Sequence, residues 1–173
     1  MNAMRIMLRW WTLYAALASA AMLGAAHAFE QFGGYAPCAL CLKQREVYWF
    51  ALVVAVPASL WALAFRSKGT PRLAAFLLFA IFTTGAITAG FHAGGELKWW
   101  ELPATCGGSK PGAISIEDLT ATITGAKTVR AVACDVAAWS FAGISMAGWN
   151  AIASALLALL SLLAARRKDS VRG

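Results

Sequence analysis

Four long apolar stretches, separated by short or polar segments, dominate the chain. They cover residues 10–29, 46–65, 73–92 and 143–165 and contain almost no charged side chains. A helix of roughly 20 mostly apolar residues is long enough to cross the hydrocarbon core of a bilayer. The pattern therefore predicts an all-α membrane protein. We expect a four-transmembrane-helix bundle forming a single membrane domain over residues 1–173, with connecting loops at about 30–45 and 93–142.

The composition supports this fold class. Hydrophobic residues make up 60% of the chain and charged residues only 13%, whereas soluble domains carry about 25% charged residues. A soluble globular domain is therefore excluded, and a disordered chain is excluded by the high apolar content.

Basic residues gather on one predicted side of the membrane. Nine of the 15 lie there with Asp169 as their one acidic neighbour: Arg5, Arg9, Arg66, Lys68, Arg72, Arg166, Arg167, Lys168 and Arg172. The other six basic residues share the loop side with seven acidic ones, so the net charge of +7 divides into +8 and −1. The positive-inside rule then places both termini in the cytoplasm and both loops outside. Because topology explains the positive charge, we do not expect binding to nucleic acid.

The first apolar stretch has an alternative interpretation. Basic residues, an apolar run and the small residues at 25–28 also resemble a signal peptide with its cleavage site. The run is longer than the 7–15 residues usual in signal peptides, so we favour a retained helix.

All four cysteines fall in the two predicted outer loops, at Cys38, Cys41, Cys106 and Cys134. Disulfides persist on the oxidising side of a membrane and are rare in the cytosol. Three connectivities are possible for four cysteines, and the loop arrangement favours Cys38–Cys41 and Cys106–Cys134. A zinc site fits the first pair but lacks a matching second pair. Purely structural disulfides are a further alternative, although a four-residue ring closes almost no loop.

The surroundings of the Cys-x-x-Cys favour redox chemistry. Gly33-Gly34 interrupts the chain, and Pro37 suits the first turn of a helix. Cys38 and Cys41 should then lie in the first turn of the second long helix, where free N–H groups and the helix dipole lower the pKa of a thiol. Arg45 lies four residues after Cys41 and shares its helix face. It can stabilise a thiolate or a reduced electron acceptor, or it can simply extend to the membrane surface.

The arrangement resembles the bacterial disulfide bond formation protein B family. The segment Pro37-Cys38-Ala39-Leu40-Cys41-Leu42-Lys43-Gln44-Arg45 is similar to its Pro-Cys-x-x-Cys-x-x-x-Arg signature, although Gln44 stands where some members have Glu. Similar motifs follow in the same order at 91–96, 99–106, 134–141 and 143–150. The resemblance implies a four-helix inner-membrane enzyme that reoxidises a periplasmic thioredoxin-fold dithiol oxidase and passes the electrons to quinone, either ubiquinone or menaquinone.

The resemblance also implies roles for the individual residues. Cys106 and Cys134 form the disulfide that the partner's thiolate attacks, with Cys106 as the site of the mixed disulfide. Cys38 and Cys41 then reoxidise that pair. Cys41 faces the quinone, and Arg45 stabilises the charge-transfer state between the Cys41 thiolate and the quinone. The rivals are a non-enzymatic membrane scaffold and a paralogue dedicated to one client oxidase.

Several further side chains carry predictions. His92 either lines the quinone headgroup or is an interfacial histidine, with Gly90 and Gly94 allowing close approach, and His27 is structural. Residues 115–123 have the pattern of a short amphipathic surface helix. Asn150 should form a hydrogen bond between helices. The tryptophans near the span ends, at 10, 11, 99, 100 and 139, are expected to anchor the protein at the membrane interfaces.

Overall fold

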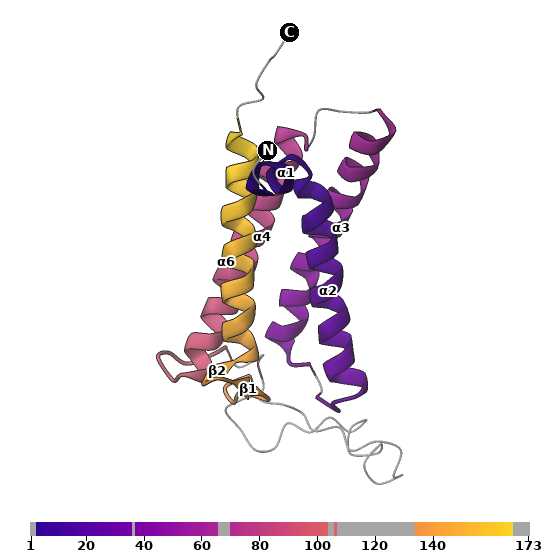
Figure 1. The fold of residues 1–173 in the computed structure, drawn as a ribbon. Coiled ribbons are helices and arrows are strands. Elements are labelled where there is room, and N and C mark those ends of the chain that lie inside the picture. The colour runs from indigo at the N-terminus through magenta and orange to yellow at the C-terminus, as the bar shows by residue number, and fades with distance from the viewer. Residues whose placement is uncertain (1–2, 36, 66–69, 104–105, 107–133, 168–173) are drawn as a thin grey trace.

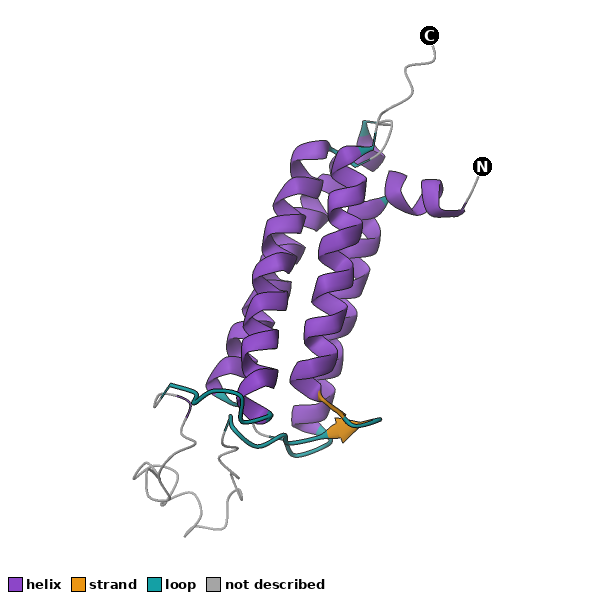
Figure 2. Cartoon of the chain, turned by 90° about the vertical axis from the view of Figure 1, so that its left-hand side faces the viewer, coloured by secondary structure: helices purple, strands orange, loops and turns teal. Residues whose placement is uncertain are grey.

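The computed structural model describes residues 3–35, 37–65, 70–103, 106 and 134–167. Four long helices run side by side as an antiparallel bundle (Figures 1 and 2): α2 (Trp11–Gln31), α3 (Ala39–Ala64), α4 (Arg72–Glu96) and α6 (Met146–Arg166). Each is long and apolar enough to cross a membrane. The short helix α1 (Ala3–Arg9) lies across one end of the bundle. The predicted four-helix membrane bundle is confirmed.

At the opposite end, α2 and α4 finish while α3 and α6 begin. We call this the cysteine end. A short hairpin lies there directly before α6, and its two strands, β1 (Ser140–Phe141) and β2 (Ile144–Ser145), have two residues each. This hairpin was not predicted from the sequence. The expected amphipathic helix at 115–123 lies outside the described residues.

Helix α3 begins seven residues before the apolar stretch that predicted it, because charged residues in its first turns lower hydropathy without preventing helix formation. The predicted start of this helix at the Cys-x-x-Cys is confirmed. Cys38 is the N-cap, and its sulfur accepts a hydrogen bond from the Cys41 backbone N–H at 3.2 Å. Pro37 therefore lies just before the cap, not in the first turn.

Small side chains line the helix contacts inside the bundle, where Ala15, Ala51, Ala75 and Ala89 are fully buried. Small residues let helix backbones approach closely, which stabilises helix association where lipid supplies no hydrophobic drive. Leucine, phenylalanine and valine side chains cover the outside of the bundle, which is the surface that a lipid bilayer requires.

Trp11 is not an interfacial anchor, contrary to the prediction. Its side chain is 2% exposed, and its indole N–H donates to Ser161 Oγ of α6 at 2.8 Å. A tryptophan near a span end satisfies the same sequence pattern whether it faces lipid headgroups or a neighbouring helix. Here the helix packing decides the outcome, and Trp11 ties the start of α2 to α6.

The chain that follows α4 and the chain around Asp135 are both held against the end of α4 or the residues next to it. Trp100 packs on Gly94 and Leu102 packs on Gly95, so a side chain at either glycine would overlap them. The Lys98 ammonium binds the carboxylate of Asp135, which follows residues 107–133 in the sequence, at 2.7 Å. The Cβ position of Gly90, by contrast, meets no described atom within 4 Å. That Gly90 and Gly94 allow close approach beside His92 stays a prediction.

Candidate functional site

All four cysteines meet at the cysteine end of the bundle. Cys38, Cys106 and Cys134 form one buried cluster, and Cys41 packs against it. The Cys134 backbone N–H donates to the Cys106 carbonyl oxygen at 3.4 Å, and the Cys134 thiol interacts electrostatically with both Cys106 and Cys38. Cysteines from two loops thus form one continuous cluster.

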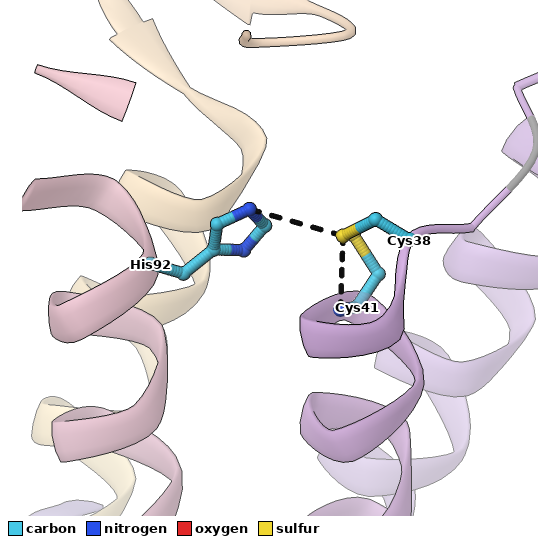
Figure 3. Close-up of side chains that lie close together, drawn as sticks. All are labelled: Cys38, Cys41 and His92. Atoms are coloured by element: carbon cyan, nitrogen blue, oxygen red, sulfur yellow. Dashed lines mark hydrogen bonds between the residues drawn. The ribbon is translucent and has the colours of Figure 1, made fainter. Parts of the chain in front are cut away.

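The Cys-x-x-Cys sulfurs lie in direct contact, with Cys38 Sγ 2.7 Å from Cys41 Sγ. Cys38 also faces His92 (Figure 3). The hydrogen bond with Cys41, together with burial, raises the pKa of the Cys38 thiol to about 12. This contradicts the prediction that the helix start lowers its pKa. The sulfur does accept an N–H of the first turn, but sharing a proton with Cys41 outweighs that contact.

The pKa values of the second cysteine pair, Cys106 and Cys134, are also raised. Burial, followed by the hydrogen bond with Cys134, raises the pKa of the Cys106 thiol to about 12. Burial raises the pKa of Cys134 as well, against the hydrogen bond that it accepts from Leu40. Thiolates are poorly stabilised at these positions, so the reduced forms of the pair are neutral dithiols near pH 7.

His92 of α4 faces the sulfur cluster from the opposite side of the site and is buried, with 3% of its surface exposed. Its Nε2 lies 3.1 Å from the Cys134 carbonyl oxygen and 3.8 Å from Cys38 Sγ. Its Nδ1 lies 2.9 Å from Gln44 Nε2. His92 is therefore an interior residue of the site, and the alternative of an interfacial histidine is not needed.

Cys38, Cys41 and His92 also raise the question of a metal, because their ligand atoms lie within 4.8 Å of one another. A metal-binding histidine must offer a lone pair to the ion. Both ring nitrogens of His92 have hydrogen-bond partners inside the protein, Gln44 on one side and the Cys134 carbonyl on the other. The geometry therefore favours thiol chemistry over metal binding at this cluster.

A cavity of about 520 Å³ opens beside the Cys-x-x-Cys. All four long helices and the segment around Trp139 contribute to its mostly apolar wall, and Cys41, Arg45 and His92 are among the few polar contributors. Ligand sites of this size are typically apolar with a few convergent polar groups. The cavity can hold a flat apolar ring system with its polar edge toward Cys41.

Arg45 lines this cavity, but its hydrogen bonds run to α2. Its guanidinium pairs with the Glu30 carboxylate and donates to the Ala26 carbonyl oxygen at 3.1 Å. The side chain is only 15% exposed, so protein atoms cover most of it. Lys43 instead pairs with Glu46 at 3.0 Å in an exposed position outside the site.

Sequence reasoning overlooked several residues of this site. In the sequence Gln44 stands out only as a departure from a motif, yet it is buried and bonds His92. Tyr48, four residues later on the same helix face, bonds Asn150 of α6, and this confirms the interhelical role predicted for Asn150. The four-residue spacing of Gln44 and Tyr48 indicates that both polar side chains lie on the same face of α3, and this could have been recognised from the sequence. Glu30 carried no pattern that linked it to Arg45.

Comparisons with known proteins agree with this geometry. The family described as "Disulfide bond formation protein DsbB" matches residues 8–164. The chain is 30% identical over 165 residues to "Disulfide bond formation protein B" of Marinobacter nauticus, covering 90% of each chain. No solved structure shows a significant match. The chain belongs to the disulfide bond formation protein B family and is a membrane oxidoreductase of disulfide bond formation.

Proposed function

We propose that the protein oxidises the reduced dithiol of a periplasmic thioredoxin-fold oxidase and passes the two electrons to a membrane quinone. The observation that carries this proposal is the single cluster of Cys106, Cys134, Cys38 and Cys41, which borders the apolar cavity at Cys38 and Cys41. A scaffold with structural disulfides has no need to bring both pairs into contact.

The first exchange takes place at the Cys106–Cys134 disulfide. A thiolate of the partner attacks Cys106 Sγ, the disulfide breaks, and Cys134 leaves with the bonding electrons. The partner's second thiolate then attacks its own sulfur in the mixed disulfide and releases Cys106. The partner has lost two electrons, and Cys106 and Cys134 are a dithiol.

The second exchange joins the two pairs. Because Cys134 contacts both Cys106 and Cys38, its thiolate is the group placed to attack Cys38 of the Cys38–Cys41 disulfide. Cys41 leaves, Cys106 attacks Cys134, and Cys38 is released. The pair at the loop is oxidised again, and Cys38 and Cys41 are now the dithiol beside the cavity.

The cavity fits a quinone headgroup in size and chemistry. Its wall is mostly apolar, while the cation of Arg45 and the Cys41 sulfur face it from α3. A bound quinone, either ubiquinone or menaquinone, supplies the acceptor for the two electrons and two protons that Cys38 and Cys41 lose when their disulfide forms again. Arg45 orients the polar edge and stabilises negative charge, and the apolar wall excludes water.

Energetics support such an acceptor. One periplasmic oxidase of the thioredoxin fold lies near −120 mV because its reduced form is stabilised, whereas ordinary structural disulfides lie below about −300 mV. The gap of about 180 mV corresponds to roughly 8 kcal/mol. The raised pKa values of Cys38 and Cys106 mean that neither of these two thiolates is stabilised. An electron acceptor that removes the electrons from Cys38 and Cys41 drives the exchanges forward.

Location follows the charge distribution. Arg9, Arg72, Arg166 and Arg167 lie at the end of the bundle opposite the cysteines. By the positive-inside rule, we place that end in the cytoplasm and the cysteine end in the periplasm, within a bacterial inner membrane. The whole chain then forms one membrane domain.

Purified protein, a reduced thioredoxin-fold oxidase and a short-chain quinone test the proposal, with quinone absorbance as the measurement. Wild type should reduce the quinone, and Cys41→Ser and Cys106→Ser should not. Ser59→Ala is a matched control, because Ser59 is buried in α3 and, among the described residues, bonds only its own helix backbone at Ala55. Full turnover by either cysteine variant, or no turnover by wild type with both disulfides intact, would refute the proposal.

A further inference from the structure

A chain of buried hydrogen bonds runs through the interior of the bundle and ends at His92. Ser154 of α6 contacts the Tyr48 hydroxyl at 3.1 Å, and Tyr48 bonds the Asn150 side-chain oxygen. The Asn150 amide nitrogen bonds Gln44 Oε1, and Gln44 Nε2 lies 2.9 Å from His92 Nδ1. We define Ser154, Tyr48, Asn150 and Gln44 as the interior chain. It links α6, α3 and α4 beneath the cysteines.

The far side of His92 determines the direction of this chain. Nε2 faces the Cys134 carbonyl oxygen at 3.1 Å and the Glu96 carboxylate at 3.7 Å. A carbonyl oxygen can only accept a hydrogen bond. Nε2 must therefore carry a proton, so in the neutral ring Nδ1 carries a lone pair and needs a donor.

Each link then has one consistent orientation. Gln44 presents its amide N–H to Nδ1, which leaves its oxygen to accept from the Asn150 amide. The Asn150 oxygen accepts from the Tyr48 hydroxyl, and the Tyr48 oxygen accepts from the Ser154 hydroxyl. Every member donates toward His92, and no member has an orphaned amide or phenol group. Satisfied networks of this kind fix side-chain orientation in a low-dielectric interior.

We propose that the interior chain is a positioning device that holds neutral His92 as its Nε2–H tautomer, so that His92 donates to the Cys134 carbonyl and keeps Cys134 beside Cys38. In this role His92 anchors the loop cysteine at the junction between the two pairs. The inference deepens the proposed function and rests on it for its kinetic consequence. The tautomer itself can be measured without any turnover.

Nitrogen-15 NMR of histidine-labelled protein in its dithiol form measures the tautomer directly. The chain has two histidines, so in a His27→Gln variant all histidine signals come from His92. We expect a protonated Nε2 and an unprotonated Nδ1. A proton on Nδ1 in place of Nε2 would overturn the proposal, whether or not the protein reduces quinone.

Variants of the interior chain test the coupling. In Asn150→Leu the Gln44 amide loses the donor that fixes it and is free to turn, so we expect signals from both tautomers. Gln44→Glu places an acceptor opposite Nδ1, so we expect Nδ1 to become protonated. Ser59→Ala removes a buried hydroxyl of the same helix outside the chain and should leave the wild-type spectrum. A single unchanged tautomer in both chain variants would overturn the proposal.

The kinetic consequence separates positioning from simple loss of structure. We expect Asn150→Leu to slow electron transfer from the Cys106/Cys134 pair to the Cys38/Cys41 pair by roughly tenfold, the effect of one buried hydrogen bond. Formation of the mixed disulfide with the partner should keep its wild-type rate. Tyr48→Phe, which removes only a hydroxyl, should slow the same transfer to a smaller extent. Equal slowing of both steps, or wild-type transfer in both variants, would contradict the role assigned to the chain.

Discussion

Arg45→Lys keeps a positive charge in the cavity wall but removes the forked guanidinium group, whose two nitrogens connect α3 to α2. The guanidinium of Arg45 binds Glu30 with one nitrogen and the Ala26 carbonyl with another. A lysine ammonium is a single point donor and cannot reproduce both contacts. Hydrogen bonds to charged groups contribute about 1.5–3 kcal/mol. Because the two side chains are 15% and 31% exposed, the lower end of that range applies.

Loss of about 1.5 kcal/mol corresponds to roughly a tenfold change in an equilibrium constant. Since Ala26 lies in the wall that α2 contributes to the cavity, we expect the apparent KM for quinone to rise by about that factor in Arg45→Lys. Arg45→Ala removes both contacts and the charge, so about a hundredfold rise is expected. The assay is the initial rate of quinone reduction against quinone concentration, at saturating reduced oxidase.

Lys43→Met is the matched control, because Lys43 is an exposed cation on the same helix that pairs only with Glu46 among the described residues. Its KM should stay within about twofold of wild type. If both Arg45 variants also stay within that range, Arg45 only joins two helices and the reasoning from its fork is refuted. If Lys43→Met raises KM as much as Arg45→Ala does, loss of positive charge and not geometry is responsible.

Two further predictions concern helix packing and thiol acidity. Trp11→Phe removes the indole bond to Ser161 and should lower the free energy of unfolding in detergent by about 1–2 kcal/mol; an equal loss in Trp10→Phe would show that the bond is unimportant. Because burial raises the pKa of Cys106 to about 12, its alkylation in the reduced protein, followed by mass spectrometry, should accelerate roughly tenfold per pH unit up to about pH 10. A plateau near pH 9 would mean an ordinary thiol pKa.

The four helices were predictable because a bilayer imposes length and apolarity on each span separately. The start of α3 was predictable for a different reason, since Pro37 and the Cys-x-x-Cys are local signals that need no partner. Both predictions depend on residues close together in the sequence, and both are confirmed.

Contacts between helices were not predictable in the same way. A span that is apolar around its whole circumference does not reveal which face meets which neighbour, so Trp11 was placed at the interface and the link from Gln44 to His92 was missed. The prediction of a lowered pKa for Cys38 was wrong for a related reason. The helix start was predicted correctly, but the hydrogen bond between Cys38 and Cys41 and the burial of the Cys38 thiol depend on tertiary structure.

Two clamps at the end of α4 have a consequence for how the protein can be altered. Trp100 packed on Gly94 holds the chain before 107–133, and the Lys98–Asp135 ion pair holds the chain after it. The positions of the two loop cysteines are thus set outside that segment, at its borders. A substitution at Gly94 or Lys98 is accordingly expected to displace a sulfur atom, although neither residue contacts a cysteine in the hydrogen bonds of the described residues.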